Sequence, residues 1–294
     1  LQGTMGSYYA LKSGEPAAVA QAIFEHYLPR FMGDDTPKTR AGLLVGLADR
    51  LDTLAGLFAA GLAPTGTKDP FAQRRAALGL VQNLIAWDMP FNLLQGLQLA
   101  SAELPIPTTP EIQAACLDFI TGRLRAYLID QGYRYDVVDA VLADQRADPA
   151  GAYKAIQQLS GWVARPDWST ILPAYARCVR ILRSENKPGS EPGRAYAESG
   201  QARLDPLDPA LFVEPQEKEL YAALQEAEAR PRRPGSVDDF LNAFVPMIPA
   251  VNRFFDTVLV MAEDPALRAN RLGLLQRIAA LAHPAADLSY LEGF

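Results

Sequence analysis

The sequence predicts an all-α protein. Apolar residues recur every three or four positions over most of the chain, which is the spacing of one face of an α-helix. The alternation of apolar and polar residues that is typical of β-strands is nearly absent. Helix starts are indicated by a capping side chain followed by proline in the first turn, at Asp69-Pro70, Thr109-Pro110, Asp148-Pro149 and Asp264-Pro265.

The expected helices of the amino-terminal half follow one another closely. Stripes of apolar side chains predict one helix around residues 19–27 and another over 43–58. We expect the next helix to begin at Pro70, and a long helix to run from Pro110 to Gln131-Gly132, where glycine favours the left-handed conformation that ends helices. A short helix is then expected over 135–142.

Two breaks interrupt the helical pattern in the carboxy-terminal half. Residues 184–206 contain two Pro-Gly pairs and few apolar residues, which predicts a long exposed loop. Residues 230–235 form the second break, after which Ser236 supplies a hydroxyl that suits a helix start. The proline-rich stretch 103–107 separates two groups of helices, so we predict a boundary between residues 1–104 and 105–294.

Composition limits the classes of function. The net charge of −6 argues against general affinity for nucleic acid, so any such contact has to be local. No apolar run is long enough to span a bilayer, and residues 1–9 lack the basic segment and apolar core of a secretory signal. The first methionine is Met5, which suggests a fragment of a longer chain. Cys116 and Cys178 lie in helical patterns without metal-ligand spacing and are expected to be buried thiols. A cytoplasmic location is expected.

Three sets of segments resemble one family. The first is residues 1–10 (LQGTMGSYYA) with 25–31 (EHYLPRF), and the second is 47–54 (LADRLDTL) with 64–79 (PTGTKDPFAQRRAALG). The third is 254–261 (FFDTVLVM) with 268–272 (RANRL) and 286–289 (ADLS). Together they are similar to the carboxy-terminal part of the β subunit of the heterotetrameric bacterial glycyl-tRNA synthetase. Arg50, Thr67 and Arg180 depart from the family pattern, which has Lys, Ser and Asn there.

The resemblance implies a fold and a function. In that family the α chain activates glycine with ATP and Mg²⁺, while the β chain supplies tRNA-binding modules that include an HD-type helical domain and a DALR-type anticodon-binding domain. Residues 1–104 would be HD-like, lacking the amino-terminal part of that domain, and 105–294 would end in the DALR-like domain. The chain would position tRNA(Gly) for glycylation by the α subunit, within an assembly of two α and two β chains. No cofactor is expected in this part.

Basic side chains are the candidate tRNA contacts, because RNA binding needs cations for phosphates and planar groups for unstacked bases. The loop 64–70 precedes a helix start and could present amides and a cation to an anion, although a tight turn capped by Asp69 explains it as well. Adjacent arginines after this loop diverge on a helix, so at most one should reach RNA while its partner packs or pairs. The candidates are Lys68, Arg74, Arg75, Arg177, Arg180, Arg183, Arg268 and Arg271.

Catalytic and metal-binding residues are not predicted. An active HD phosphohydrolase binds metal through several His and Asp side chains, whereas this chain has two histidines, His26 and His283, and no His-Asp dipeptide. Asp49 resembles the distal aspartate of the HD pattern, but we interpret Asp49 and Asp52 as residues that either form hydrogen bonds inside a helical core or cap a neighbour. Phe254 and Phe255 lie on an apolar face and are interpreted as core. The alternatives are an HD-type phosphohydrolase and a helical scaffold that binds only proteins.

Overall fold

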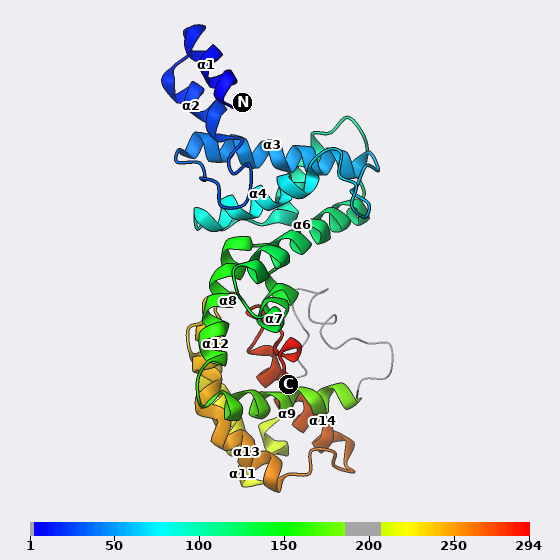
Figure 1. The fold of residues 1–294 in the computed structure, drawn as a ribbon. Coiled ribbons are helices and arrows are strands. Elements are labelled where there is room, and N and C mark those ends of the chain that lie inside the picture. The colour runs from blue at the N-terminus through cyan, green and yellow to red at the C-terminus, as the bar shows by residue number, and fades with distance from the viewer. Residues whose placement is uncertain (1–2, 186–206) are drawn as a thin grey trace. The chain divides into compact units, whose positions relative to one another are not determined.

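The computed structural model describes residues 3–185 and 207–294 (Figure 1). The all-α prediction is confirmed: these residues form helices and turns, and their only β-type pairing is an isolated bridge between Thr65 and Lys68. The chain divides into two compact units. Unit 1 comprises Leu1–Gly132 and Arg146–Tyr153, and unit 2 comprises Tyr133–Gln145 and Lys154–Phe294.

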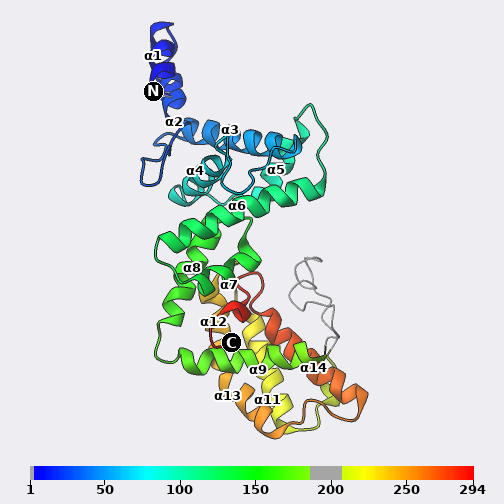
Figure 2. The same cartoon turned by 45° about the vertical axis from the view of Figure 1, so that its right-hand side comes forward.

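Unit 1 is a bundle of four helices with a helical hairpin at its amino-terminal end. The hairpin consists of α1 (Thr4–Lys12) and α2 (Ala17–Glu25), and α2 packs on α3. The bundle consists of α3 (Arg40–Ala59), α4 (Gln73–Ala86), α5 (Leu93–Ala102) and α6 (Pro110–Asp130), which lie side by side (Figure 2). Its core contains the predicted apolar stripe of residues 43–58 together with Leu80, Leu84, Ile120 and Leu124.

Unit 2 is built from further helices and short 3₁₀ turns. Its helices are α7 (Tyr135–Gln145), the larger part of α8 (Pro149–Val163), α9 (Trp168–Glu185), α11 (Pro215–Ala229), α12 (Val237–Phe244), α13 (Ile248–Thr257) and α14 (Pro265–Ala280). The 3₁₀ turns are η1 (Pro209–Leu211), η2 (Val245–Met247) and η3 (Leu288–Tyr290). Helices α9 and α11 each pack against both α13 and α14. Phe254 is fully buried, as predicted, and Phe255 is partly exposed.

The division into units differs from the boundary predicted at residues 104 and 105. Helix α6 packs against α3, α4 and α5, so the proline-rich stretch 103–107 connects two helices of the same unit. Proline there prevents a continuous helix without ending the hydrophobic core. The predicted loop 184–206 lies outside the described residues from 186 onward, and α9 extends to Glu185.

Most predicted helix ends are confirmed, with one exception. The side chains of Thr109, Ser236 and Asp264 cap α6, α12 and α14, and Gly132 has a φ of 93° after α6. The expected start at Pro70 is wrong, because α4 begins at Gln73 after Ala72, whose φ is 55°. Cys116 and Cys178 are free and buried, as predicted, and burial raises the pKa of each thiol to about 12. None of the described helices meets the length and hydropathy of a membrane span.

Candidate nucleic-acid interface

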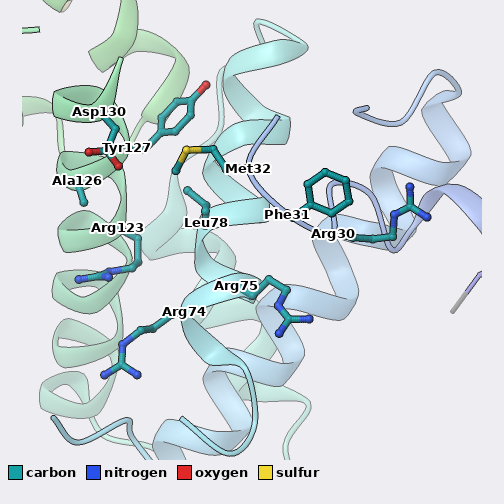
Figure 3. Close-up of a pocket in the computed structure, with 10 residues that line it drawn as sticks. All are labelled: Arg30, Phe31, Met32, Arg74, Arg75, Leu78, Arg123, Ala126, Tyr127 and Asp130. Carbon is teal, nitrogen blue, oxygen red and sulfur yellow. The ribbon is translucent and has the colours of Figure 1, made fainter. Parts of the chain in front are cut away.

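Four arginines of unit 1 line a hollow of about 500 Å³ (Figure 3). The segment after α2, helix α4 and helix α6 each contribute part of its lining. We call it the basic hollow and define it by Arg30, Phe31, Met32, Arg74, Arg75, Leu78, Arg123, Ala126, Tyr127 and Asp130. It therefore combines guanidinium groups with aromatic and apolar side chains, the two kinds of group that bind single-stranded nucleic acid.

The backbone that presents Arg30 and Phe31 is fixed by a buried arginine of α3. Arg50 is 6% exposed, and its guanidinium donates hydrogen bonds to the carbonyls of His26 (2.7 Å), Tyr27 (3.2 Å) and Leu28 (2.9 Å), and to that of Gly46 (2.9 Å). Burial lowers the pKa of Arg50. Its positive charge thus faces backbone dipoles, and the segment 26–28 is held against α3.

Two glycines make room for this guanidinium. A Cβ atom on Gly46 would lie 2.9 Å from a nitrogen of Arg50, and one on Gly79 of α4 would lie 2.8 Å from its Nε atom. Asn83 of α4 donates a further hydrogen bond of 3.0 Å to the carbonyl of Leu28. The motifs around residues 47–54 and 73–79 therefore have a structural role, which is to hold residues 26–28.

A buried carboxylate fixes the other end of the same region. Glu25, the last residue of α2, accepts hydrogen bonds from the backbone amide (2.9 Å) and hydroxyl (2.5 Å) of Thr39, the N-cap of α3. Burial alone would raise the pKa of Glu25, but the hydrogen bonds from Thr39 and Gln21 lower it below its ordinary value. The segment 26–39 is thus anchored at both ends, and Arg30, Phe31 and Met32 within it line the basic hollow.

Two of the four arginines of the hollow have acidic partners. Arg30 donates to Asp34 at 2.8 Å, and this hydrogen bond holds the pKa of Asp34 at about 2. Arg74 lies 3.8 Å from a carboxylate oxygen of Asp69 and donates a hydrogen bond to the carbonyl of Gly66. These contacts fix the two guanidinium groups in place.

The other two arginines have no such partner among the described residues. Arg75 is exposed, and its side chain makes neither a hydrogen bond nor an ion pair within residues 3–185 and 207–294. The Nε atom of Arg123 is buried and has no acceptor there. Arg74 and Arg75 leave α4 in different directions (Figure 3). Such divergence is expected of adjacent positions on a helix, and which of the two reaches RNA stays a prediction.

The loop 64–70 is the capped turn that the sequence allowed. Gly66 has a φ of 53°, and the bridge between Thr65 and Lys68 closes the turn. Asp69 accepts hydrogen bonds from the amides of Gln73 (2.8 Å) and Arg74 (2.9 Å), at the start of α4. Lys68 is exposed but does not line the basic hollow. The geometry shows a helix cap and leaves the role of Lys68 as a prediction.

The candidate arginines of α9 lie over aromatic rings. Arg177 stacks on Phe255 at 4.7 Å and lies 3.6 Å from Asp256, whereas Arg180 and Arg183 lie 5.8 and 5.5 Å from the ring of Phe294. The neighbouring Tyr175 is buried and donates its hydroxyl to the carbonyl of Ala279, so it does not offer a free ring face. Arg180 is exposed, and Arg268 of α14 is partly exposed.

Arg271 does not belong with the surface candidates. Its side chain is 8% exposed, and its Nε atom donates to the fully buried Glu217 at 2.6 Å. It also donates to the carbonyl of Leu259 at 2.8 Å. Placing Arg271 among tRNA contacts is therefore contradicted: the side chain joins α11 to α14 in the core of unit 2.

Acidic residues and histidines do not form a metal centre in the described part of the chain, where no three of His, Cys, Asp and Glu gather around one point. Asp49 and Asp52 are both exposed on α3, so the expectation that they lie inside the helical core is wrong. His26 contacts the carbonyl of Ile23 at 2.7 Å and the ring of Tyr27. The Nδ1 atom of His283 lies 3.6 Å from a carboxylate oxygen of Asp144.

Sequence reasoning did not single out several residues of the basic hollow. Arg30 and Phe31 stand in a segment that resembles the family, whereas Arg123 and Tyr127 stand in none of the family segments. One signal was available for the last two, because they stand at i, i+4 on the predicted helix from Pro110 and therefore share a face. Their approach to α4 depends on tertiary packing and is not visible in the sequence.

The described residues are those of an all-helical protein with arginine-lined surfaces and aromatic side chains beside them. Comparison with known proteins points to one family. Residues 1–143 match the family model described as glycyl-tRNA synthetase beta subunit. Proteins named glycine–tRNA ligase beta subunit are 39% identical in Moorella thermoacetica, 38% in Delftia acidovorans and 38% in Myxococcus xanthus, each over 99% of this chain. Over almost its whole length the chain is therefore similar to members of the glycyl-tRNA synthetase β subunit family.

The match covers only part of each relative. The chain corresponds to 41%, 40% and 41% of the lengths of these three proteins, so it spans about two fifths of the curated relatives that it matches.

Proposed function

We propose that this chain is the tRNA-binding portion of a glycine–tRNA ligase β subunit, and that it positions tRNA(Gly) for ATP-dependent glycylation by the α subunit. The observation that carries the proposal is the similarity of 99% of the chain to proteins named glycine–tRNA ligase beta subunit. The exposed arginines of both units support the proposal, above all Arg75 and Arg180. Their charges are accessible to a ligand, whereas Arg271 is paired with the buried Glu217.

The two units would serve different parts of the tRNA. Unit 1 would be the HD-like module, and unit 2 would end in the DALR-like anticodon-binding module, with Arg177, Arg180, Arg183 and Arg268 as its candidate contacts. Holding both ends of the tRNA raises the effective concentration of its terminal ribose at a distant active site, which accelerates ligation without bond chemistry in this chain. The proposal places ATP and Mg²⁺ in the α subunit, and assigns no catalytic residue here.

The partners follow from the same proposal. They are tRNA(Gly), the α subunit and the remainder of the β chain, in an assembly of two α and two β chains located in the cytoplasm. A helical scaffold that binds only proteins is the second candidate. One observation favours it: Met5, Tyr8, Tyr9 and Leu11 of α1 are all exposed, and large apolar side chains gathered on one helix are typical of protein contacts.

The experiment compares two reactions of the α and β holoenzyme. Charge reversal at Arg180 and Arg268 should lower the rate of tRNA glycylation at least tenfold, while glycine-dependent pyrophosphate exchange, which needs no tRNA, stays within twofold of the unmodified enzyme. Arg40→Gln, at an exposed position at the start of α3, is the matched control and should change neither rate. Equal loss of both reactions would contradict positioning, and unchanged glycylation would favour the scaffold.

A further inference from the structure

We infer that the exposed face of α1 is an internal contact of the longer β chain, where an apolar segment of the same chain, outside these 294 residues, covers it. The inference rests on the proposed function, since it takes the chain to be part of a glycine–tRNA ligase β subunit, and it names the partner that α1 binds. Three observations carry it: the apolar side chains on both faces of α1, the scarcity of charge around them, and the length of the relatives.

Helix α1 is apolar on two opposite faces. On one face Gly6 and the buried Ala10 pack against α2, where a Cβ atom on Gly6 would lie 2.8 Å from the Cγ2 atom of Ile23. The other face exposes four large hydrophobic side chains, those of Met5, Tyr8, Tyr9 and Leu11. A helix with hydrophobic side chains all round is typical of a protein interior. We therefore expect α1 to have a contact on both sides.

The hairpin of α1 and α2 has little hydrophobic core of its own. Among the described elements, α2 is the one that packs extensively against α1 (Figure 1). The two helices bury Ala10, Ala20 and Glu25, so their buried apolar side chains are alanines. With nine residues, α1 is shorter than the roughly 12–15 residues that a helix needs to persist alone in water. Its stability has to come from packing, and a second layer would supply it.

The scarcity of charge on the hairpin identifies the kind of partner. Residues 3–24 contain two charged side chains, Lys12 and Glu15, although 21% of the whole chain is charged. An RNA requires several cations on the surface that binds it, and a single lysine does not supply them. Surfaces poor in charge and rich in tyrosine and methionine are typical of the buried centres of protein interfaces. The partner of α1 is therefore an apolar protein segment.

The length of the relatives favours a segment of the same chain over a separate molecule. This chain corresponds to 41%, 40% and 41% of the three relatives, so about three fifths of each lies outside the match. A segment joined by the backbone can reach its contact at an effective concentration of roughly millimolar. A second copy of the chain, or a separate subunit, would have to compete with it from free solution.

Helix α3 of the same unit carries a second exposed apolar stripe. Ala41, Leu44, Val45 and Ala48 stand at i, i+3, i+4 and i+7, so they share one face of the helix, and all four are exposed. Unit 1 thus presents apolar side chains without cover on two of its helices. A remainder of about three fifths of a β chain is long enough to contact both.

The test measures how fast a maleimide reagent labels cysteines placed on α1. The variants are Tyr9→Cys and Leu11→Cys, at positions that are 61% and 52% exposed, and the matched control is Gln98→Cys, at an exposed position of α5. Mass spectrometry reads each labelled peptide in the 294-residue chain, in the full-length β chain and in the holoenzyme of α and β subunits. Hydrogen exchange of the α1 amides in the unmodified chains gives the same comparison without a substitution.

The expected result is shielding within the β chain. Both α1 cysteines should react about 30-fold more slowly in the full-length β chain than in the 294-residue chain, because labelling then requires a local opening. The α1 amides should exchange more slowly in the longer chain as well. Gln98→Cys should react at the same rate in both chains, and addition of the α subunit or of tRNA(Gly) should change none of these rates.

Equal labelling and equal hydrogen exchange of α1 in the two chains would overturn the inference. Shielding that requires the α subunit, or tRNA(Gly), or a high concentration of the 294-residue chain would assign the face to that partner or to a second copy, and would overturn it too. The proposed tRNA role is judged separately. A shielded α1, together with glycylation that charge reversal at Arg180 and Arg268 leaves unchanged, would refute that role alone.

Discussion

Replacement of Arg50 by methionine tests the physical basis of unit 1. The substitution keeps an unbranched apolar stem and removes all the guanidinium donors. Of the four carbonyls that Arg50 contacts, that of Leu28 retains its hydrogen bond from Asn83, and that of Gly46 lies within α3, where a helical amide also donates to it. The carbonyls of His26 and Tyr27 receive no other donor within the described residues.

The expected loss of stability follows from those two carbonyls. A buried polar group left without a partner costs about 1–3 kcal/mol, so two of them cost about 2–6 kcal/mol. Removing a desolvated charge offsets part of this cost. We expect Arg50→Met to destabilise unit 1 by about 3 kcal/mol. Arg50→Lys, whose ammonium group can donate to some of the same carbonyls, should cost about 1 kcal/mol.

Hydrogen exchange followed by mass spectrometry measures this loss within unit 1 separately from unit 2. A loss of about 3 kcal/mol should speed exchange of the slowest amides of α3 and α4 by about 100-fold. Asp49→Asn, at the exposed neighbouring position, is the control and should leave exchange unchanged. The reasoning is refuted if Arg50→Met speeds exchange less than fivefold, because the buried guanidinium would then contribute nothing that water could not replace.

Three further predictions concern single side chains. Arg271→Met should destabilise unit 2 by about 3–5 kcal/mol in urea unfolding, since it leaves the buried charge of Glu217 unpaired, whereas Arg268→Met, one turn earlier and partly exposed, should change stability by less than about 0.5 kcal/mol. Arg30 lowers the pKa of Asp34 to about 2, so the pair stabilises the fold above about pH 4, and this contribution disappears as the pH falls towards 2. Asp34→Asn should therefore reduce the dependence of the free energy of unfolding on pH in that interval, and an unchanged dependence would contradict the pairing. Burial raises the pKa of both thiols to about 12, so a thiol reagent at pH 8 should label Cys116 and Cys178 only in urea, and rapid labelling of the native chain would disprove their burial.

The sequence predicted the features that depend on local periodicity. The stripe of Leu43, Leu47, Leu51 and Leu54 identified α3 and its buried face, because successive turns of a helix repeat every 3.6 residues. The same geometry places Asp49 on the opposite face, so its exposure could have been predicted. Arg50 lies one turn from Gly46 and Leu54 on the buried side, which was a signal for a buried arginine.

Features that depend on distant residues were not predictable in this way. Arg268 and Arg271 have the same spacing as any basic pair on a helix surface. Glu217, which makes Arg271 a core residue, lies 54 positions earlier in the chain. The basic hollow joins Arg30, Arg75 and Arg123 from three separate elements, and nothing in the local pattern of any one of them indicates the other two.

The net charge of −6 sets a physical limit on how this chain can bind RNA. At physiological ionic strength electrostatic interactions are screened over about 8 Å, so an acidic chain attracts a polyanion only where its cations lie within contact distance. Arg30 and Arg74 add little net charge to the hollow, because Asp34 and Asp69 balance them. Arg75 supplies exposed charge without a side-chain partner among the described residues, whereas the Nε atom of Arg123 is buried. Under the proposed function, RNA binding would therefore depend on local contacts with exposed cations and not on the overall charge of the chain.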